Sequence, residues 1–180
     1  SGWRFCFMYS DAAVRREAGL METTIRPIQG REEIDVCARM MAGSEPWITL
    51  QRDYDASVQT LTSPGKEVYV AADGRQILGF IILNMQGGFI GYIQSIGVAP
   101  EWRSRGIGRR LVAYAEERVF RVSPNVFICV SSFNPGAQRF YRSLGYEAIG
   151  ELKDWIVRGH SEILLRKTIA PWREFKKRPV

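Results

Sequence analysis

The sequence predicts a single mixed α/β domain in which helices cover a sheet. In the first half of the chain, segments with strand character follow one another through short turns. In the second half, helical segments separate the strands. Successive strands joined by turns are typical of an antiparallel meander, whereas a helix that connects two strands is typical of parallel pairing. We therefore expect one mixed sheet, and the length of 180 residues suits one domain.

Turn residues divide the first half into its elements. Gly43 is expected to end a helix, and Pro64-Gly65, Asp73-Gly74 and Gly87-Gly88 mark turns. Alternating or β-branched runs between them predict strands, and apolar residues at helical spacing predict helices. The predicted strands are 23–28, 68–72, 77–85 and 89–98, and the predicted helices are 31–43 and 50–62.

The second half alternates helices and strands, with Gly145 as the expected helix stop. The predicted helices are 108–122 and 135–144, and the predicted strands are 126–130, 146–150 and 162–167. The sheet would then hold about seven strands, with parallel pairing where a helix crosses back.

The ends of the chain are expected to lie outside the domain. Position 1 is Ser, and Met21 precedes the first strand, so residues 1–20 are interpreted as an extension, a tag or an upstream mis-start. An ordinary helix over 11–20 is the alternative. The domain would then span 21–168, followed by a basic tail over 169–180. Residues 166–180 hold six basic residues and one acidic residue, which accounts for most of the net charge of +6.

Composition argues against several classes of function. Three widely spaced cysteines argue against a disulfide framework and a cysteine-rich zinc site, and favour a reducing, cytoplasmic compartment. The single histidine, His160, excludes a metal site built on several histidines. The apolar run 77–83 is too short to span a membrane. Nucleic-acid binding is not expected, because the charge lies mostly in the tail and no groove-reading motif is present.

A glycine-containing loop between a strand and a helix carries the clearest chemical signal. Residues 96–111 read Ile-Gly-Val-Ala-Pro-Glu-Trp-Arg-Ser-Arg-Gly-Ile-Gly-Arg-Arg-Leu. Backbone N–H groups at such a loop and at the following helix N-terminus suit a pyrophosphate, and four arginines surround it. Arg109 and Arg110 stand where a Walker loop needs Lys and Ser or Thr, and Leu111 replaces the third glycine of a dinucleotide fingerprint. A plain strand-to-helix turn with surface arginines is the alternative interpretation.

Two motifs together resemble the GNAT superfamily of N-acetyltransferases. The first is Arg103-x-x-Gly106-x-Gly108 after the strand ending in Val98-Ala99-Pro100. The second runs from Asn134 to Tyr146 and reads Asn-Pro-Gly-Ala-Gln-Arg-Phe-Tyr-Arg-Ser-Leu-Gly-Tyr. The resemblance covers about residues 23–168. It implies a mostly antiparallel sheet that splays apart at a central parallel pair, with helices on both faces and acetyl-CoA bound in the splay.

The resemblance also implies roles for individual residues. The strand edge and the loop would hold acetyl-CoA, together with a side-chain amide and an aromatic ring. These cofactor positions are Ile96, Val98, Arg103, Ser104, Arg105, Gly106, Ile107, Gly108, Asn134 and Phe140. The Val98 N–H would stabilise the oxyanion, and Tyr141 would act as general acid for the thiolate. Packing against Phe140 is the alternative role for Tyr141.

The general base and the acceptor amine stay open. The strand segment 92–95 lacks the carboxylate that some family members carry there, so ordered water, Glu45 or Asp154 are candidates. His160 fits better as a turn or edge residue, with a base role as the alternative. The expected acceptor site comprises Glu45, Trp47, Tyr92 and Trp155, although the tryptophans would equally suit capping of the core.

The resemblance thus implies transfer of the acetyl group of acetyl-CoA to a primary amine on a small molecule, peptide or protein. The alternative is a non-catalytic acyl-CoA-binding or sensor module on the same fold. Neither a metal nor a membrane partner is expected, and assembly as a homodimer is left open.

Overall fold

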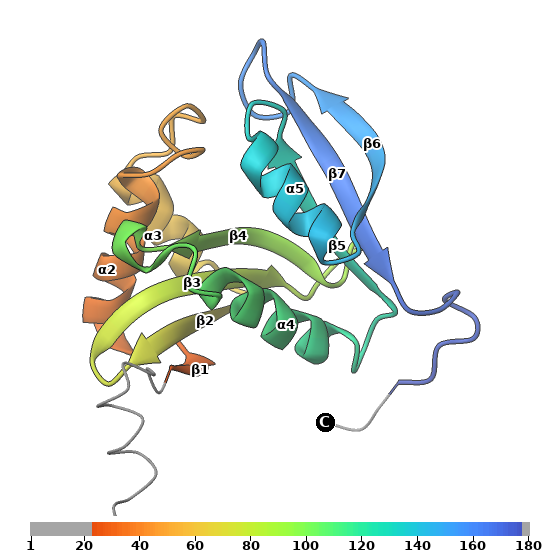
Figure 1. The fold of residues 1–180 in the computed structure, drawn as a ribbon, viewed down its shortest axis with the longest axis horizontal. Coiled ribbons are helices and arrows are strands. Elements are labelled where there is room, and N and C mark those ends of the chain that lie inside the picture. The colour runs from red at the N-terminus through yellow and green to blue at the C-terminus, as the bar shows by residue number, and fades with distance from the viewer. Residues whose placement is uncertain (1–22, 178–180) are drawn as a thin grey trace, which may run out of the picture.

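The computed structural model describes residues 23–177 (Figure 1). The predicted extension over 1–20, including its alternative helix, lies outside the described residues. The last described strand ends at Thr168, and residues 169–177 continue without a helix or strand. The division into extension, domain and tail therefore stays a prediction.

The fold class predicted from the sequence is confirmed. Among the described residues, seven strands form one sheet in the order β1-β2-β3-β4-β5-β7-β6. The strands are β1 (Thr24–Pro27), β2 (Lys66–Asp73), β3 (Gln76–Asn84), β4 (Tyr92–Val98), β5 (Asn125–Ser131), β6 (Glu147–Lys153) and β7 (Ser161–Thr168). The α-helices are α2 (Gly30–Ala42), α3 (Tyr54–Thr62), α4 (Ile107–Val119) and α5 (Pro135–Ser143), and a short 3-10 turn spans Pro100–Trp102.

Local capping explains where some elements begin later than predicted. Helix α3 begins at Tyr54 and not at residue 50, because the Asp53 side chain accepts a hydrogen bond from the Ala56 N–H at 2.8 Å. Residues before Asp53 form turns. Strand β4 begins at Tyr92, since residues 88–91 still belong to the turn that follows Gly87.

The sheet opens at its centre. Every neighbouring pair of strands is antiparallel except β4 and β5, which pair in parallel at two positions, Tyr92 with Phe127 and Ile93 with Ile128. Beyond Ile93 the two strands separate, as Figure 1 shows. The residues after Ile93 on β4 therefore have a neighbouring strand, β3, on one side alone.

A β-bulge in β4 lies where the two strands begin to separate. Ile82 of β3 pairs with Ser95 and Leu83 pairs with Ile93, so Gln94 is an extra residue in β4. Such a bulge bends the strand and re-aims the side chains around it. Tyr92 and Ser95 consequently face the same side of the sheet, although they are an odd number of residues apart.

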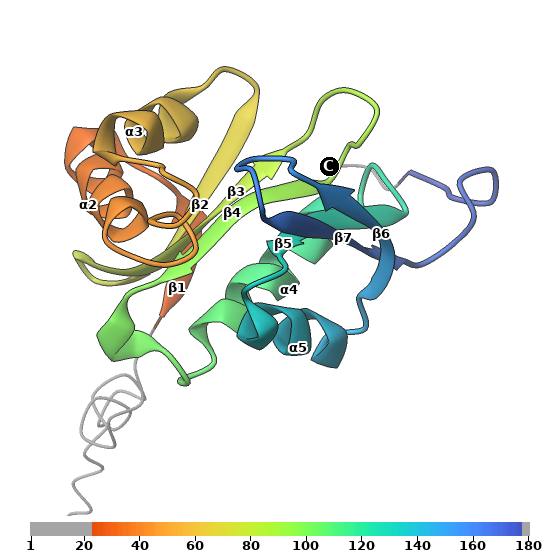
Figure 2. The ribbon, with the colours of Figure 1, turned by 90° about the horizontal axis from the view of Figure 1, so that it is seen from above.

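Helices cover the two faces and create two cores. Helices α2 and α3 pack on one face of β1–β4, whereas α4 and α5 lie on the opposite face (Figure 2). The core under α4 contains Leu111 and Ile81, and the core under α2 contains Met41 and Phe80. Within residues 23–177, no helix has the length and apolar character needed to cross a membrane.

Candidate active site

Two connected hollows occupy the space where β4 and β5 separate. The larger, which we call the outer cleft, has a volume of about 840 Å³ and runs from the loop before α4 to the start of α5. The smaller, which we call the inner pocket, has a volume of about 120 Å³ and lies between β4 and β5. Six residues border both: Pro46, Trp47, Ile96, Asn134, Ala137 and Tyr141.

The open edge of β4 supplies backbone groups to the outer cleft. The Ala99 N–H donates to the carbonyl of Leu78 in β3 at 2.9 Å. Because successive N–H groups in a strand point to opposite edges, the Val98 N–H is directed away from β3, toward the opening. The carbonyl of Val98 accepts a hydrogen bond from Arg103 Nε at 3.2 Å. Val98 thus offers a donor at the edge of the cleft.

The N-terminus of α4 forms one end of the outer cleft. Gly106 precedes the helix with φ +80°, a left-handed conformation that glycine adopts without strain. The first helical hydrogen bond runs from the Arg110 N–H to the carbonyl of Gly106 at 3.0 Å. The N–H groups of Ile107, Gly108 and Arg109 precede it in the first turn and are free of helical partners. They form a suitable site for an anion.

The four arginines of the loop point in different directions. Arg103 and Arg109 line the outer cleft. The Arg105 guanidinium stacks 4.7 Å from the ring centroid of Trp102 and does not line the cleft, and Arg110 donates to the carbonyl of Thr23. Positive charge beside the helix terminus therefore comes from two of the four side chains.

Helix α5 begins and ends with well-defined caps. Asn134 caps its N-terminus by accepting from the Ala137 N–H at 3.0 Å, which leaves its amide nitrogen able to donate. At the other end, the Gly145 N–H donates to Arg142 and the Tyr146 N–H donates to Tyr141. This is a Schellman motif, with Gly145 at φ +87°, and it confirms the predicted helix stop.

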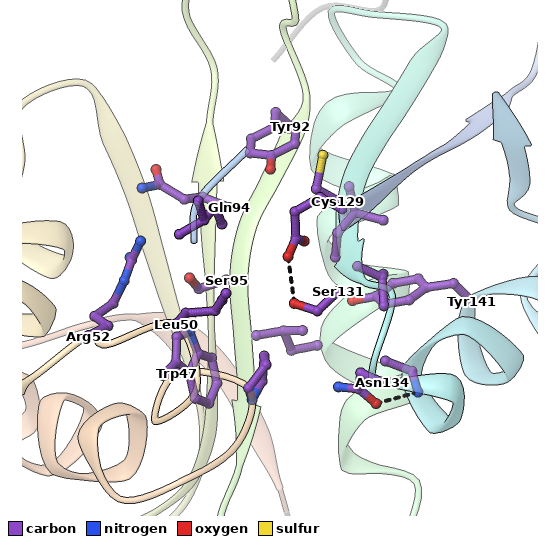
Figure 3. A pocket seen from close by; sticks show the side chains of 17 residues that line it. Trp47, Leu50, Arg52, Tyr92, Gln94, Ser95, Cys129, Ser131, Asn134 and Tyr141 are labelled. Carbon is purple, nitrogen blue, oxygen red and sulfur yellow. Dashed lines mark hydrogen bonds between the residues drawn. The ribbon is translucent and has the colours of Figure 1, made fainter. Parts of the chain in front are cut away.

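Tyr141 projects from α5 to the junction of the two hollows (Figure 3). Its side chain is 2% exposed, and its ring packs edge-on against two other rings. The distances between ring centroids are 5.1 Å to Phe140 and 5.2 Å to Tyr146. Its hydroxyl has no hydrogen-bond partner among the described residues. Burial, with a smaller effect of Tyr92, raises the pKa of Tyr141 above its usual range, so the phenol carries its proton at neutral pH.

The inner pocket is lined by polar groups from three strands. Gln94 and Ser95 of β4 and Cys129 and Ser131 of β5 line it, and Tyr92 lies at the end where the two strands still pair (Figure 3). Burial and the adjacent Cys129 thiol raise the pKa of Tyr92. The amide oxygen of Gln94 is buried and has no partner in the described part of the chain.

Glu162 of β7 also lines the inner pocket and is absent from the residues predicted from the sequence. Its side chain is 3% exposed, and the Ser131 hydroxyl donates to its Oε1 at 2.6 Å. Burial raises the pKa of the Glu162 carboxyl, and the Ser131 hydrogen bond lowers it in part. The one signal in the sequence is a glutamate at the start of an otherwise apolar strand segment, Glu-Ile-Leu-Leu. The pairing of β7 with β5 is needed to show that this glutamate lies beside Ser131.

The residues predicted to bind the acceptor separate into three locations. Trp47 is buried against Phe80 and borders both hollows, and Tyr92 lines the inner pocket. Glu45 lines the outer cleft, where its carboxylate accepts from the N–H and hydroxyl of Thr49. Trp155 is 62% exposed and lines neither hollow; Ile156 lines the inner pocket instead.

Two of the candidate bases are also held away from both hollows. The Asp154 carboxylate accepts from the Gly159 N–H at 2.6 Å within the loop between β6 and β7. The His160 ring packs edge-on against Phe133 at 4.8 Å. Residues 23–177 contain no group of His, Cys, Asp and Glu side chains that could hold a metal ion.

Similar proteins combine this fold with acetyl transfer. The chain is 30% identical over 116 residues to the N-alpha-acetyltransferase RimI of Mycobacterium tuberculosis, which covers 63% of this chain and 69% of that protein. A GNAT-family structure from Desulfovibrio desulfuricans matches with a TM-score of 0.70 at 20% identity, over 82% of this chain and 99% of the other. An aminoglycoside 6'-N-acetyltransferase complexed with coenzyme A matches with a TM-score of 0.67 at 21% identity, over 82% and 98%.

These structural likenesses concern the fold, and the family follows from the sequence itself. The model of the acetyltransferase (GNAT) family matches residues 31–146, which include both motifs that border the outer cleft. The described protein therefore belongs to the GNAT family of acetyltransferases.

Proposed function

We propose that this protein transfers the acetyl group of acetyl-CoA to a primary amine. The observation that carries the proposal is the buried Tyr141 hydroxyl, which has no partner among residues 23–177 and lies where the outer cleft meets the inner pocket. A buried hydroxyl without a partner costs stability, and a role in the reaction explains its retention. Acetyl-CoA would supply the reactive thioester at that junction.

The outer cleft fits a ligand of this kind. The N–H groups at the start of α4, with Arg103 and Arg109, would hold the pyrophosphate. The open edge of β4 at Ile96 and Val98 would pair with the pantetheine amides, and the Asn134 amide nitrogen would donate to them. Gly108 adds no side chain to this wall, where a Cβ would lie 3.6 Å from Phe140 Cζ and 3.8 Å from Val98 Cγ2, two other residues that line the cleft.

Two groups would act on the reacting atoms. The Val98 N–H would donate to the carbonyl oxygen as negative charge develops on it. Tyr141 would give its proton to the departing sulfur. A thiolate formed in the same water-poor space is also destabilised by burial, so the raised pKa of Tyr141 does not prevent the transfer.

The acceptor would reach the acetyl group through the inner pocket. Trp47 and Tyr92 wall this side, and the polar lining suits an amine better than an apolar compound. The relative named above acetylates an alpha-amino group by its name, and a structural neighbour acts on an aminoglycoside by its title. Both groups of compounds are therefore the first acceptors to test.

The test measures donor binding and turnover separately. Acetyl-CoA at about 100 times its Kd should stabilise the folded protein by about 2.7 kcal/mol, which raises Tm by roughly 5–10 °C for a chain of this size. Thiol release should then depend on an added amine, tested with a hexapeptide bearing a free N-terminus, spermidine, kanamycin and n-propylamine. Stabilisation without thiol release would favour the acyl-CoA-binding module, and the absence of both would refute the proposal.

A further inference from the structure

One buried carboxylate has no part in the function proposed above. Glu162 reaches the inner pocket from β7, which lies on the far side of β5 from β4. We propose that Glu162 binds the ammonium group of the acceptor and takes its proton before the amine attacks. This inference rests on the proposed acetyltransferase function and adds the acceptor's charge state and the general base.

The position of Glu162 is fixed by strand pairing. Glu162 pairs with Ser131 across β5 and β7, and the Ser131 hydroxyl donates to Glu162 Oε1 at 2.6 Å. A carboxylate can accept about four hydrogen bonds, so most of its capacity is left for a ligand. The side chain is 3% exposed, so its remaining acceptor sites face the pocket and not bulk water.

The other part-buried carboxylates that contact strands of this sheet have cations beside them. Glu67 pairs with Arg118 at 2.5 Å and Glu116 pairs with Lys167 at 2.7 Å. Glu162 forms no ion pair within residues 23–177, although a buried carboxylate without a counter-charge is costly. A cationic ligand would remove this cost.

The groups that face Glu162 are neutral, with one exception at the rim. Tyr92 of β4, Cys129 of β5 and Tyr141 of α5 all have a pKa raised by burial, and Glu162 contributes to the rise for Tyr92 and Cys129. Arg52, before α3, is the one basic side chain lining the inner pocket, and its Nη1 donates to Thr60 Oγ1 at 3.1 Å. Glu162 is therefore the one acidic side chain among the described residues that line the pocket, and Arg52 the one basic side chain.

The acceptor groups in the pocket match an ammonium ion. A primary ammonium has three N–H donors. The pocket lining offers the free oxygen of Glu162, the Ser131 hydroxyl oxygen and the Tyr92 hydroxyl oxygen, which Figure 3 shows directed toward the gap between the strands.

The proton balance follows from this arrangement. The ammonium gives one proton to Glu162, which passes it to water, and the neutral nitrogen forms a bond to the acetyl carbonyl carbon while the carbon–sulfur bond breaks. Tyr141 protonates the sulfur and recovers a proton from the nitrogen. The amide keeps the third proton. The products are the acetylated amine, the thiol and one proton released to water.

The experiment compares Glu162→Gln with wild type at saturating acetyl-CoA, with the most active amine of the panel. The amide retains the acceptor oxygen for Ser131, so the fold should persist. We expect kcat/KM for the amine to fall about 100-fold or more, while the acetyl-CoA-induced rise in Tm stays unchanged. Glu162→Asp should recover part of the loss. Glu151→Gln, an exposed carboxylate on the neighbouring β6, is the matched control and should behave as wild type.

The pH profile separates a base from a merely structural residue. In wild type, kcat/KM should fall as acid protonates Glu162, at a pH above the usual range of a glutamate. In Glu162→Gln this limb should vanish and the rate should follow the fraction of neutral amine in solution. An unchanged rate or an unchanged acid limb, with an active wild type, overturns the Glu162 assignment alone. A wild type that binds acetyl-CoA and acetylates no amine overturns the proposed function, and the assignment with it.

Discussion

Replacing Tyr141 with Phe should make the protein more stable and much less active. The change removes one hydroxyl that is buried and has no hydrogen-bond partner among the described residues, and it leaves the ring in place. An unsatisfied buried polar group costs about 1–3 kcal/mol. The free energy of unfolding should therefore rise by about 1 kcal/mol or more, which corresponds to a Tm increase of roughly 2–4 °C per kcal/mol. Loss of the acid should lower kcat by about 10²–10⁴-fold.

Urea denaturation and thiol release measured on the same preparation would test this prediction. Tyr146→Phe is the matched control for activity, because its ring contacts that of Tyr141 at 5.2 Å but lines neither hollow. It should turn over as wild type does. A Tyr141→Phe protein that is clearly less stable than wild type would show that the hydroxyl has a structural partner. One with an unchanged kcat would remove Tyr141 as the acid.

Three further changes test separate parts of the site. Gly108→Ala should fold normally, since the new Cβ would lie at an ordinary contact distance of 3.6 Å from Phe140 Cζ. Isothermal titration should show that the variant binds acetyl-CoA at least about 10-fold more weakly, which corresponds to about 1.4 kcal/mol of binding free energy. Equal affinity would show that the ligand does not approach Gly108. Asn134→Asp should keep the α5 cap and lose acetyl-CoA affinity, whereas Asn134→Ala should also lose about 1 kcal/mol of stability in urea titrations; equal stabilities would contradict the capping role. Burial raises the pKa of Glu162 in the folded protein, so its contribution favours folding below its unfolded pKa and is lost as pH rises through the folded value. Glu162→Gln should therefore exceed wild type in stability at pH 7.5 and approach it at pH 4, and the opposite trend would show that ionised Glu162 is stabilised in the fold.

Most of the fold was predictable because its signals are local. Glycine and proline turns separate the strands, and helical periodicity marks α2 and α4 within a few residues of their observed bounds. The loop around Gly106 and the α5 segment could be placed beside each other only through the family resemblance, since they are distant in sequence. The structure brings both to the outer cleft.

The inner pocket could not be predicted in the same way. Glu162 and Ser131 are 31 positions apart and meet through the register of β5 and β7, which no local pattern specifies. The orientation of Gln94 depends on one extra residue in a ladder, and alternation alone would place it differently. Trp155 illustrates the converse error, because an aromatic residue in the expected loop points to solvent while its neighbour Ile156 lines the pocket.

The separation of β4 and β5 gives the molecule two sheet edges in its interior. Exposed edges elsewhere invite pairing with other chains, and proteins normally shorten, charge or cover them. Here two side chains lie beside the open strand edges and line both hollows. They are Trp47, from the connection after α2, and Asn134, at the start of α5. A narrow, extended, amide-bearing molecule can enter between these side chains, whereas another polypeptide strand with full side chains would meet both. We therefore expect a thin strand-like ligand to fit between Trp47 and Asn134 more readily than a second polypeptide strand would.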